Sequence, residues 1–441
     1  MERRGVVFWF LLWLIGSVFW LSQDFLIRDG DEEGHVGAAE LFVQLLHEQG
    51  VLSWASELLW GDYGEYPPLF AAVLGGWWYA WAEQPEHLGV RVFGLLFVAG
   101  AAISTELWSL RRGGAPWIAF LVVLLSPLLN GIGRHFMIEV PLVLFSALLG
   151  LSFTLKGRSA HVLGGVALGL GLLCKQTFLI AILPMLLWSI RPKMWLMLVV
   201  AAALALPWYA AQMAAQSSYL TQSWGGEQVS WWMHVCAPIL TMSWELLGPV
   251  LGGVLFFSLA RRRSLSQEAV WLMCALILFA IIPKKYPRLL LGLMPYIAVL
   301  ISKELKGWNP LLQHSIVLAC ACWLGWGSLN IVPPNPLRTK ADEQCPQNWL
   351  RPPADDLGLS KASAWVEQSQ EGSVYVIEEG IPCDLQTTHP FSTHLETYLR
   401  RRGFEHDVIG VVNQEEVGTD AIVVLRWTPQ GVVLVDSLQS R

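Results

Sequence analysis

Residues 6–22 of the chain are VVFWFLLWLIGSVFWLS, and an acidic segment, Arg28-Asp29-Gly30-Asp31-Glu32-Glu33-Gly34-His35, follows them closely. The apolar run begins just after Arg3 and Arg4, which is typical of a signal peptide or a signal anchor. No small-residue cleavage site follows it, and many apolar runs come later. We therefore predict a retained first membrane-spanning helix that begins in the cytoplasm and places the acidic segment at the outer surface.

The composition of the 441 residues predicts a chain that crosses a membrane many times. Hydrophobic residues make up 54% and charged residues 15%, whereas soluble domains carry about 25% charged residues. The net charge of −6 provides no basic surface for a nucleic acid, so that class of partner is excluded. Further apolar runs lie near 91–110, 115–132, 139–155, 161–174, 177–190, 194–212, 238–260, 268–283, 288–302 and 311–330.

The run 67–82 (PPLFAAVLGGWWYAWA) is either a span or an amphipathic helix on the membrane surface. The distribution of basic residues decides between the two, because cytoplasmic loops are rich in lysine and arginine. If 67–82 lies flat, the loops on the side of the N-terminus carry Arg111, Arg112, Lys156, Arg158, Arg191, Lys193, Arg261, Arg262, Arg263, Lys303 and Lys306. We therefore predict a flat helix, about eleven spans, a cytoplasmic N-terminus and a C-terminal tail outside the cell membrane.

The chain changes character from about residue 339. The tail carries three strand-like runs and one helix-like segment, at 373–379, 421–427, 431–437 and 394–404. The alternation of the two patterns predicts a small α/β domain over 339–441, separated by a proline-rich linker from a membrane domain over 1–332.

The seven cysteines show no spacing typical of a metal site. Most of them lie in or beside apolar runs and are expected to be small buried hydrophobic residues. Cys345 and Cys383 lie in the tail and could form one disulfide if the tail faces an oxidising compartment.

The acidic segment concentrates four carboxylates, on Asp29, Asp31, Glu32 and Glu33. Like charges this close repel one another unless a cation is present. Such a cluster suits a general base, a divalent-metal site, or both. A solvated helix start is the alternative interpretation, because acidic residues are favoured in the first turn of a helix.

Three later turns on the predicted outer side add basic residues and a further carboxylate. They hold Arg134 with Glu139, then Lys175, and then Lys284, Lys285, Tyr286 and Arg288. A carboxylate at the end of an apolar helix is costly unless paired, and Arg134 is its partner nearest in sequence. Single lysines or arginines at helix ends often only reach toward lipid headgroups. Together, however, the turns predict a site for a phosphate-bearing substrate, with a carboxylate to accept a proton.

The order of these motifs resembles that of a known family. The motifs are Asp31-Glu32, Tyr66-Pro67-Pro68-Leu69, Arg91, Arg134 with the IEVPL segment, Lys175 at the end of GLGLLCK, Pro207-Trp208-Tyr209, and Lys284-Lys285-Tyr286-Pro287-Arg288. Over roughly residues 5–300, this order is similar to that of membrane glycosyltransferases with the GT-C fold. The protein O-mannosyltransferase and lipid A aminoarabinose transferase group is the most similar.

The resemblance implies an all-α membrane domain in which surface helices of the first outer loop frame a cavity open to the bilayer. It implies a polyprenyl-phosphate-linked sugar as the donor and an inverting transfer to a lipid, glycan or protein acceptor on the outer face of the cell membrane. Catalytic roles fall on Asp31, with Glu32 beside it, and on Glu139, where the family usually has aspartate. Asp31 and Glu139 are also the expected ligands if a divalent cation takes part.

The same resemblance assigns the donor phosphate to the basic turns. Lys175 matches the family's phosphate-contacting lysine, and Lys284, Lys285, Tyr286 and Arg288 match its basic and aromatic outer turn. We add Arg134, which lies in the same predicted outer region.

Two other classes of function compete with a transferase. A transporter or flippase for an anionic lipid or lipid-linked sugar would share the cationic site. Transporters, however, often show inverted repeats and interrupted helices at mid-membrane depth, whereas these charges lie at outer helix ends. A membrane scaffold with a partner-binding outer domain would leave the outer cations and carboxylates unexplained.

Overall fold

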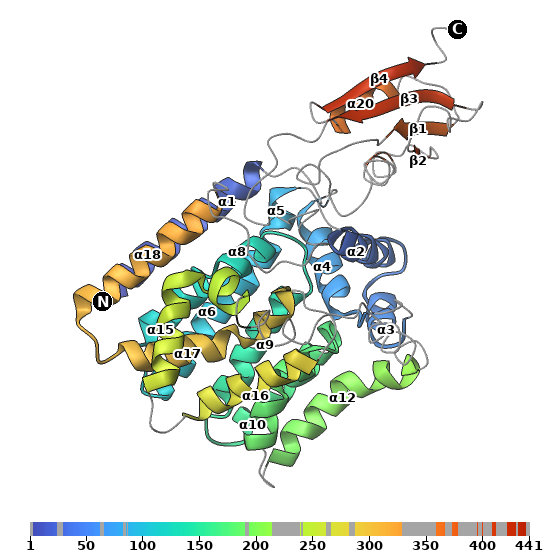
Figure 1. Ribbon diagram of the computed structural model, residues 1–441. Coiled ribbons are helices and arrows are strands. Elements are labelled where there is room, and N and C mark those ends of the chain that lie inside the picture. Colours follow the sequence, from blue (N-terminus) through green and yellow to red (C-terminus); the bar gives the residue numbers. More distant parts are fainter. Residues whose placement is uncertain are drawn as a thin grey trace. The chain divides into compact units, whose positions relative to one another are not determined.

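The computed structural model describes residues 3–23, 30–61, 66–82, 85, 87–189, 194–213, 239, 241–261, 266–281, 287–328, 359–366, 373–377, 395, 399, 408–411, 421–428 and 431–437. The chain divides into two compact units (Figure 1). The first comprises residues 1–21, 35–337 and 349–351, and its described residues are almost all helical. The second comprises residues 22–34, 338–348 and 352–441 and contains the sheet.

The chain begins with α1 (Arg3–Gln23), the predicted first span, which is followed by α2 (Gly30–Glu48), α3 (Val51–Trp60) and α4 (Leu69–Trp81). Phe42 of α2 packs against Ala71 and Ala72 of α4, and Trp54 of α3 covers this contact. The indole Nε1 of Trp54 also donates to the carbonyl oxygen of Ala72 at 3.2 Å. The run 67–82 thus forms a 13-residue helix, shorter than the roughly 20 residues of a perpendicular span. Its position at the membrane surface stays a prediction.

The remaining apolar runs form a helical bundle. Its helices are α5 (Leu88–Arg91), α6 (Phe93–Arg111), α7 (Pro116–Leu124), α8 (Pro127–Gly133), α9 (Glu139–Ser152), α10 (Arg158–Cys174), α11 (Phe178–Ser189), α12 (Trp195–Ala211), the π-helix η2 (Thr241–Leu246), α15 (Gly248–Arg261), α16 (Gln267–Ile281), the 3₁₀-helix η3 (Pro287–Leu293), α17 (Met294–Leu305) and α18 (Pro310–Ser328). α6 packs against α7 and α9, α10 packs against α9 and α12, and α17 packs against α6 and α7 (Figure 1).

Within the described residues, two helical segments are long and apolar enough to cross a membrane, Gly5–Ser22 and Leu88–Arg111. A third is present if Pro116–Leu124 and Pro127–Gly133, which meet at an angle of 55°, form one bent span. Other apolar helices have 10–17 residues. The helical bundle expected from the sequence is therefore present, whereas the expected number of about eleven spans stays a prediction.

The break between α7 and α8 is stabilised by polar side chains that replace the lost helical hydrogen bonds. Asn130 Nδ2 donates to the carbonyl oxygens of Leu124 at 2.7 Å and Ser126 at 2.8 Å. Trp13 of α1 in turn donates from Nε1 to Asn130 Oδ1 at 2.5 Å. In a membrane such backbone groups need internal partners, so this network fixes the bend and the turn that follows α8.

Glycines allow α6 to approach α8 and α9 closely. A Cβ on Gly94 of α6 would overlap the carbonyl oxygen of Gly133 at the end of α8. A Cβ on Gly150 of α9 would lie 2.5 Å from ring atoms of Trp108 of α6. The absence of a side chain at these two positions is therefore a requirement of the packing that holds the start of α9 in place.

The second unit contains α20 (Leu359–Val366), β1 (Ser373–Ile377), β2 (Val408–Val411), β3 (Ala421–Thr428) and β4 (Gly431–Ser437). The strand order is β2-β1-β3-β4; β1 pairs in parallel with β2 and β3, and β3 pairs antiparallel with β4. Three strands match the runs expected in the tail, and β2 is additional. Of the expected helix around 394–404, only Leu395 and Leu399 are described, both helical and buried. Cys345 and Cys383 lie outside the described residues.

Candidate active site

Glu139, the first residue of α9, is a carboxylate buried in the helical bundle. It is 1% exposed and follows the turn after α8. Pro141 lies in the first turn of α9, where its missing N–H removes no helical hydrogen bond. The carboxylate also lies at the positive end of the helix dipole, which favours a negative charge. The local sequence thus explains both the helix start and the acceptance of a charged group there.

Lys175 brings an ammonium group to this carboxylate from the end of α10. Its backbone is extended, with φ −158°, so the helix ends, although its N–H still bonds to the carbonyl of Gly171 at 3.1 Å. Lys175 Nζ lies 2.6 Å from Glu139 Oε1, and the two side chains are 5% and 2% exposed. A charge-assisted hydrogen bond of this length, shielded from solvent, is a strong interaction.

Arg288, the second residue of η3, contributes a second cation. Its Nε lies 3.4 Å from the same Oε1 of Glu139, and its side chain is 13% exposed. The other carboxylate oxygen, Oε2, is buried and has no hydrogen-bond partner in the described part of the chain. Within the described part of the chain, Glu139 therefore contacts two cationic groups through one oxygen, and its second oxygen contacts none.

An aromatic group lies beside the ammonium of Lys175. The Nζ atom is 5.1 Å from the centroid of the Tyr66 ring. His35 of α2 meets Tyr66 edge-on at 5.5 Å and Phe70 of α4 at 5.4 Å. His35 is 7% exposed and is close enough to Glu139 to interact with it electrostatically. The α2 and α4 helices thus supply one wall of the site.

Further basic side chains are buried in the helical bundle, and two of them, Arg134 and His135, belong to the turn that precedes α9. The Arg134 guanidinium carbon lies 5.0 Å from the centroid of Trp20 of α1, and His135 meets the same ring edge-on at 5.6 Å. Arg134, His135 and Arg91 are 5%, 2% and 2% exposed. Among the described ion pairs, Glu139 is paired with Lys175 and Arg288.

The structure places the other expected residues as far as it describes them. Asp31 and Glu32 lie in the first turn of α2, and the Glu32 side chain is fully buried. The Asp31 side chain is not among the described groups. Lys284, Lys285 and Tyr286 also lie outside the described residues. Of the predicted set, Glu139, Lys175 and Arg288 are shown to meet.

Sequence reasoning did not identify two parts of this arrangement. Tyr66 was noted only as the start of a motif, and His35 only as the end of the acidic segment. Neither residue carries a signal for its contact, because the partners are brought together by packing of α2, α4 and α10.

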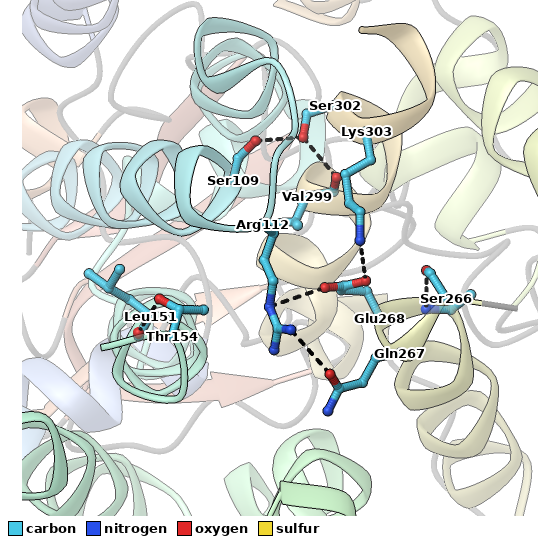
Figure 2. Close-up of polar contacts among 11 residues, drawn as sticks. Ser109, Arg112, Leu151, Thr154, Ser266, Gln267, Glu268, Val299, Ser302 and Lys303 are labelled. Carbon is cyan, nitrogen blue, oxygen red and sulfur yellow. Dashed lines mark hydrogen bonds and ion pairs between the residues drawn. The ribbon is translucent and has the colours of Figure 1, made fainter. Parts of the chain in front are cut away.

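A second buried ionic cluster joins α6, α16 and α17 (Figure 2). Glu268 is 1% exposed and lies between Lys303, at 2.9 Å, and Arg112, at 3.4 Å. Arg112 also donates to Gln267 Oε1 at 3.2 Å, and Ser109 bonds to Ser302 at 2.7 Å. From the sequence, Arg112 and Lys303 were expected only as basic residues of cytoplasmic loops. In the structure, both pair with the buried Glu268 and connect the ends of three helices. We call these three residues the Glu268 clamp.

The described side chains provide few ligands for a metal ion. No three His, Cys, Asp or Glu residues among them come together in a way that could hold an ion. Glu139 Oε2 is one available oxygen ligand, and the Asp31 side chain lies outside this comparison. The described residues alone therefore do not form a metal centre.

Comparison with known proteins defines the fold. No family model matches the chain. No curated protein matches it either. A solved structure does: the crystal structure of ArnT from Cupriavidus metallidurans bound to undecaprenyl phosphate is 13% identical, with a TM-score of 0.62 over 94% of this chain and 87% of that one. The chain thus has an ArnT-like fold, the GT-C-like architecture that the order of its motifs implied.

Proposed function

We propose that the protein is a membrane glycosyltransferase that moves a sugar from a polyprenyl-phosphate-linked donor to an acceptor on the outer face of the cell membrane. The observation that carries this proposal is the buried Glu139, with Lys175 and Arg288 on one of its oxygens. The similar fold of ArnT, which was crystallised with undecaprenyl phosphate, supports a lipid phosphate as part of the donor.

The cations suit the chemistry of the leaving group. When the bond between the sugar and the phosphate breaks, negative charge grows on a phosphate oxygen, and cationic donors in a site shielded from water stabilise that charge. Lys175 has three N–H donors, and one of them is directed to Glu139. We assign the phosphate to Lys175, Arg288 and Arg134, together with Lys284, Lys285 and Tyr286 of the turn before η3.

The carboxylates suit the other half of the reaction. The acceptor hydroxyl loses its proton to Asp31, and its oxygen attacks the anomeric carbon from the face opposite the phosphate. The carbon–oxygen bond to the phosphate breaks, its electron pair stays on the lipid phosphate, and the sugar is inverted. Glu139 orients the acceptor through Oε2, and Glu32 supports Asp31 in the same helical turn.

No step of this mechanism is assigned to a metal ion, because the described residues do not form a site. A divalent cation held by Asp31 and Glu139 would help neutralise the leaving phosphate. Treatment with a chelator followed by re-addition of Mg²⁺ or Mn²⁺ tests this. Loss and recovery of turnover would show the requirement, and unchanged turnover would exclude it.

The experiment for the proposal begins with the donor. Lipid mass spectrometry of cells with and without the gene would identify the lipid-linked sugar that accumulates when the protein is missing. The purified protein in nanodiscs should then release polyprenyl phosphate and glycosylate an acceptor. Movement of the intact lipid-linked sugar across the bilayer, with no bond broken, would contradict the proposal and favour a flippase.

A further inference from the structure

The Lys175 ammonium contacts two groups of different kinds, a carboxylate and an aromatic ring. Glu139 accepts a hydrogen bond from its Nζ at 2.6 Å, and the centroid of the Tyr66 ring lies 5.1 Å from the same nitrogen. An ammonium within about 6 Å of a ring centroid, over its face, is attracted by the electron density of the ring. We propose that Tyr66 is a positioning residue that holds the Lys175 ammonium where the donor phosphate is to be met. This inference rests on the function proposed above.

The position of the Tyr66 ring is itself well determined. Pro67 and Pro68 follow directly, and Pro68 is the N-cap of α4. A residue before proline is restricted to extended backbone, so Tyr66 has little freedom. The Tyr66 ring is also held by packing, because the centroid of the His35 ring lies 5.5 Å from its own. His35 in turn packs on Phe70, which is 3% exposed. The ring is therefore a firm surface against which a flexible side chain can be fixed.

A lysine needs such a surface more than most residues do. Its charge is carried at the end of four rotatable bonds, and contact with Glu139 alone restrains it from one side. An aromatic ring restrains the ammonium from another side without adding a negative charge and without accepting a conventional hydrogen bond. The charge of Lys175 and its other N–H donors thus stay available for an anionic headgroup.

Binding of a long-chain polyprenyl phosphate to the protein in nanodiscs tests this role. Tyr66→Leu removes the ring and should weaken binding by about 2- to 30-fold, the range of a cation–ring contact. Tyr66→Phe keeps the ring and should retain most of the affinity. Tyr79→Leu is the matched control, because Tyr79 lies on α4, is 46% exposed and contacts His47 at 4.7 Å; it should bind as the wild type does.

A double-mutant cycle with Lys175→Met separates positioning from general packing. In the Lys175→Met background, Tyr66→Leu should cause no further loss of binding. The same loss in both backgrounds, or equal binding by Tyr66→Phe and Tyr66→Leu, would overturn the inference.

The proposed function and the inference can fail separately. Wild-type protein that binds no polyprenyl phosphate would contradict the function. The double-mutant cycle would then be measured on the unfolding equilibrium of the protein in detergent instead of on binding. There the Tyr66 and Lys175 substitutions should be coupled by a factor of about 2 to 30 in the unfolding equilibrium. Additive effects would overturn the inference.

Discussion

At the scale of single residues, Lys175 connects the stability of the site with its chemistry. Lys175→Ala should slow transfer roughly 10²- to 10³-fold, the usual cost of removing one donor to a developing anion. It should also lower the free energy of unfolding by about 3 kcal/mol, because Glu139 loses a buried partner. Turnover of the purified variant with the native donor, together with its unfolding in detergent, measures both effects.

A second variant separates the two effects. In Glu139→Gln/Lys175→Ala the buried carboxylate is neutral, so part of the lost stability should return while transfer stays slow. If Lys175→Ala keeps normal donor kinetics, the lysine serves the stability of its buried pair with Glu139 and not the donor. Recovery of turnover in the double variant would show that the single substitution acted through folding alone.

We expect Asp31 and Glu139 to have different roles in the proposed reaction. Asp31→Asn should abolish transfer, because the amide is nearly isosteric but cannot accept a proton. Glu139→Gln should leave a reduced but measurable rate, with altered dependence on the acceptor or on a metal. Both are measured by turnover with the identified lipid donor. Normal turnover of Asp31→Asn with an inactive Glu139→Gln would reverse the assignment.

The sequence predicted that Glu139, Lys175 and Arg288 belong to one site, but it did not indicate which of them are in contact. Glu139, Lys175 and Arg288 were recognised because charges at the ends of apolar helices need an explanation. Pairing with Arg134, only five positions away, was one alternative interpretation of Glu139. The described partners of Glu139 are 36 and 149 positions distant. Contacts of this range depend on helix packing, which periodicity does not specify.

At the scale of elements, the close approach of α6 to α8 depends on Gly94 of α6 and Gly133 of α8. Gly94→Ala would place a methyl group against the carbonyl of Gly133, and backbone cannot rotate away as a side chain can. We expect a loss of about 1–3 kcal/mol of unfolding free energy, typical of overpacking, and a displaced turn at Arg134. Gly76→Ala on α4 is the control, because no atom lies within 4 Å of its added Cβ. Equal unfolding curves for the two variants would contradict the packing described here.

The Glu268 clamp gives a second prediction at this scale. Glu268→Ala would leave Arg112 and Lys303 beside each other without their shared carboxylate (Figure 2). Loss of one member of a buried ionic group costs about 3–5 kcal/mol, so the unfolding midpoint should fall clearly. Glu48→Ala, at an exposed position that ends α2, should leave it nearly unchanged. Donor binding, if retained at low temperature, would show that the clamp serves stability and not the site.

Elements with a strong local signal were predicted well, and those defined by their neighbours were not. β1, β3 and β4 lie in the runs of β-branched residues expected as strands, whereas β2 has only four residues and exists by pairing with β1. Similarly, the apolar run 115–132 was expected as one helix but breaks by 55° between α7 and α8. Pro127 and the Asn130 bonds that satisfy the break explain this.

At the scale of the whole molecule, orientation in the membrane is the property that the proposed function requires most. The basic loops gather on the side of the N-terminus only if 67–82 does not cross the bilayer. The 13-residue α4 packs on α2 and α3, and its orientation in the membrane stays a prediction. We therefore expect Glu48, at the end of α2, to lie outside the cell, and Arg111 and Lys156 to lie in the cytoplasm.

Cysteine labelling tests this orientation directly. All three positions are exposed, so a cysteine at each should react with a reagent on the side of the membrane that it faces. The variants are Glu48→Cys, Arg111→Cys and Lys156→Cys, each made in a chain without native cysteines. A membrane-impermeant maleimide should label Glu48→Cys in intact cells, and the other two only after the membrane is opened. If Arg111→Cys or Lys156→Cys is labelled in intact cells, α4 or another helix crosses the membrane differently. The ends of α9 and α10 that hold Glu139 and Lys175 would then face the cytoplasm, and the acceptor would have to be sought there.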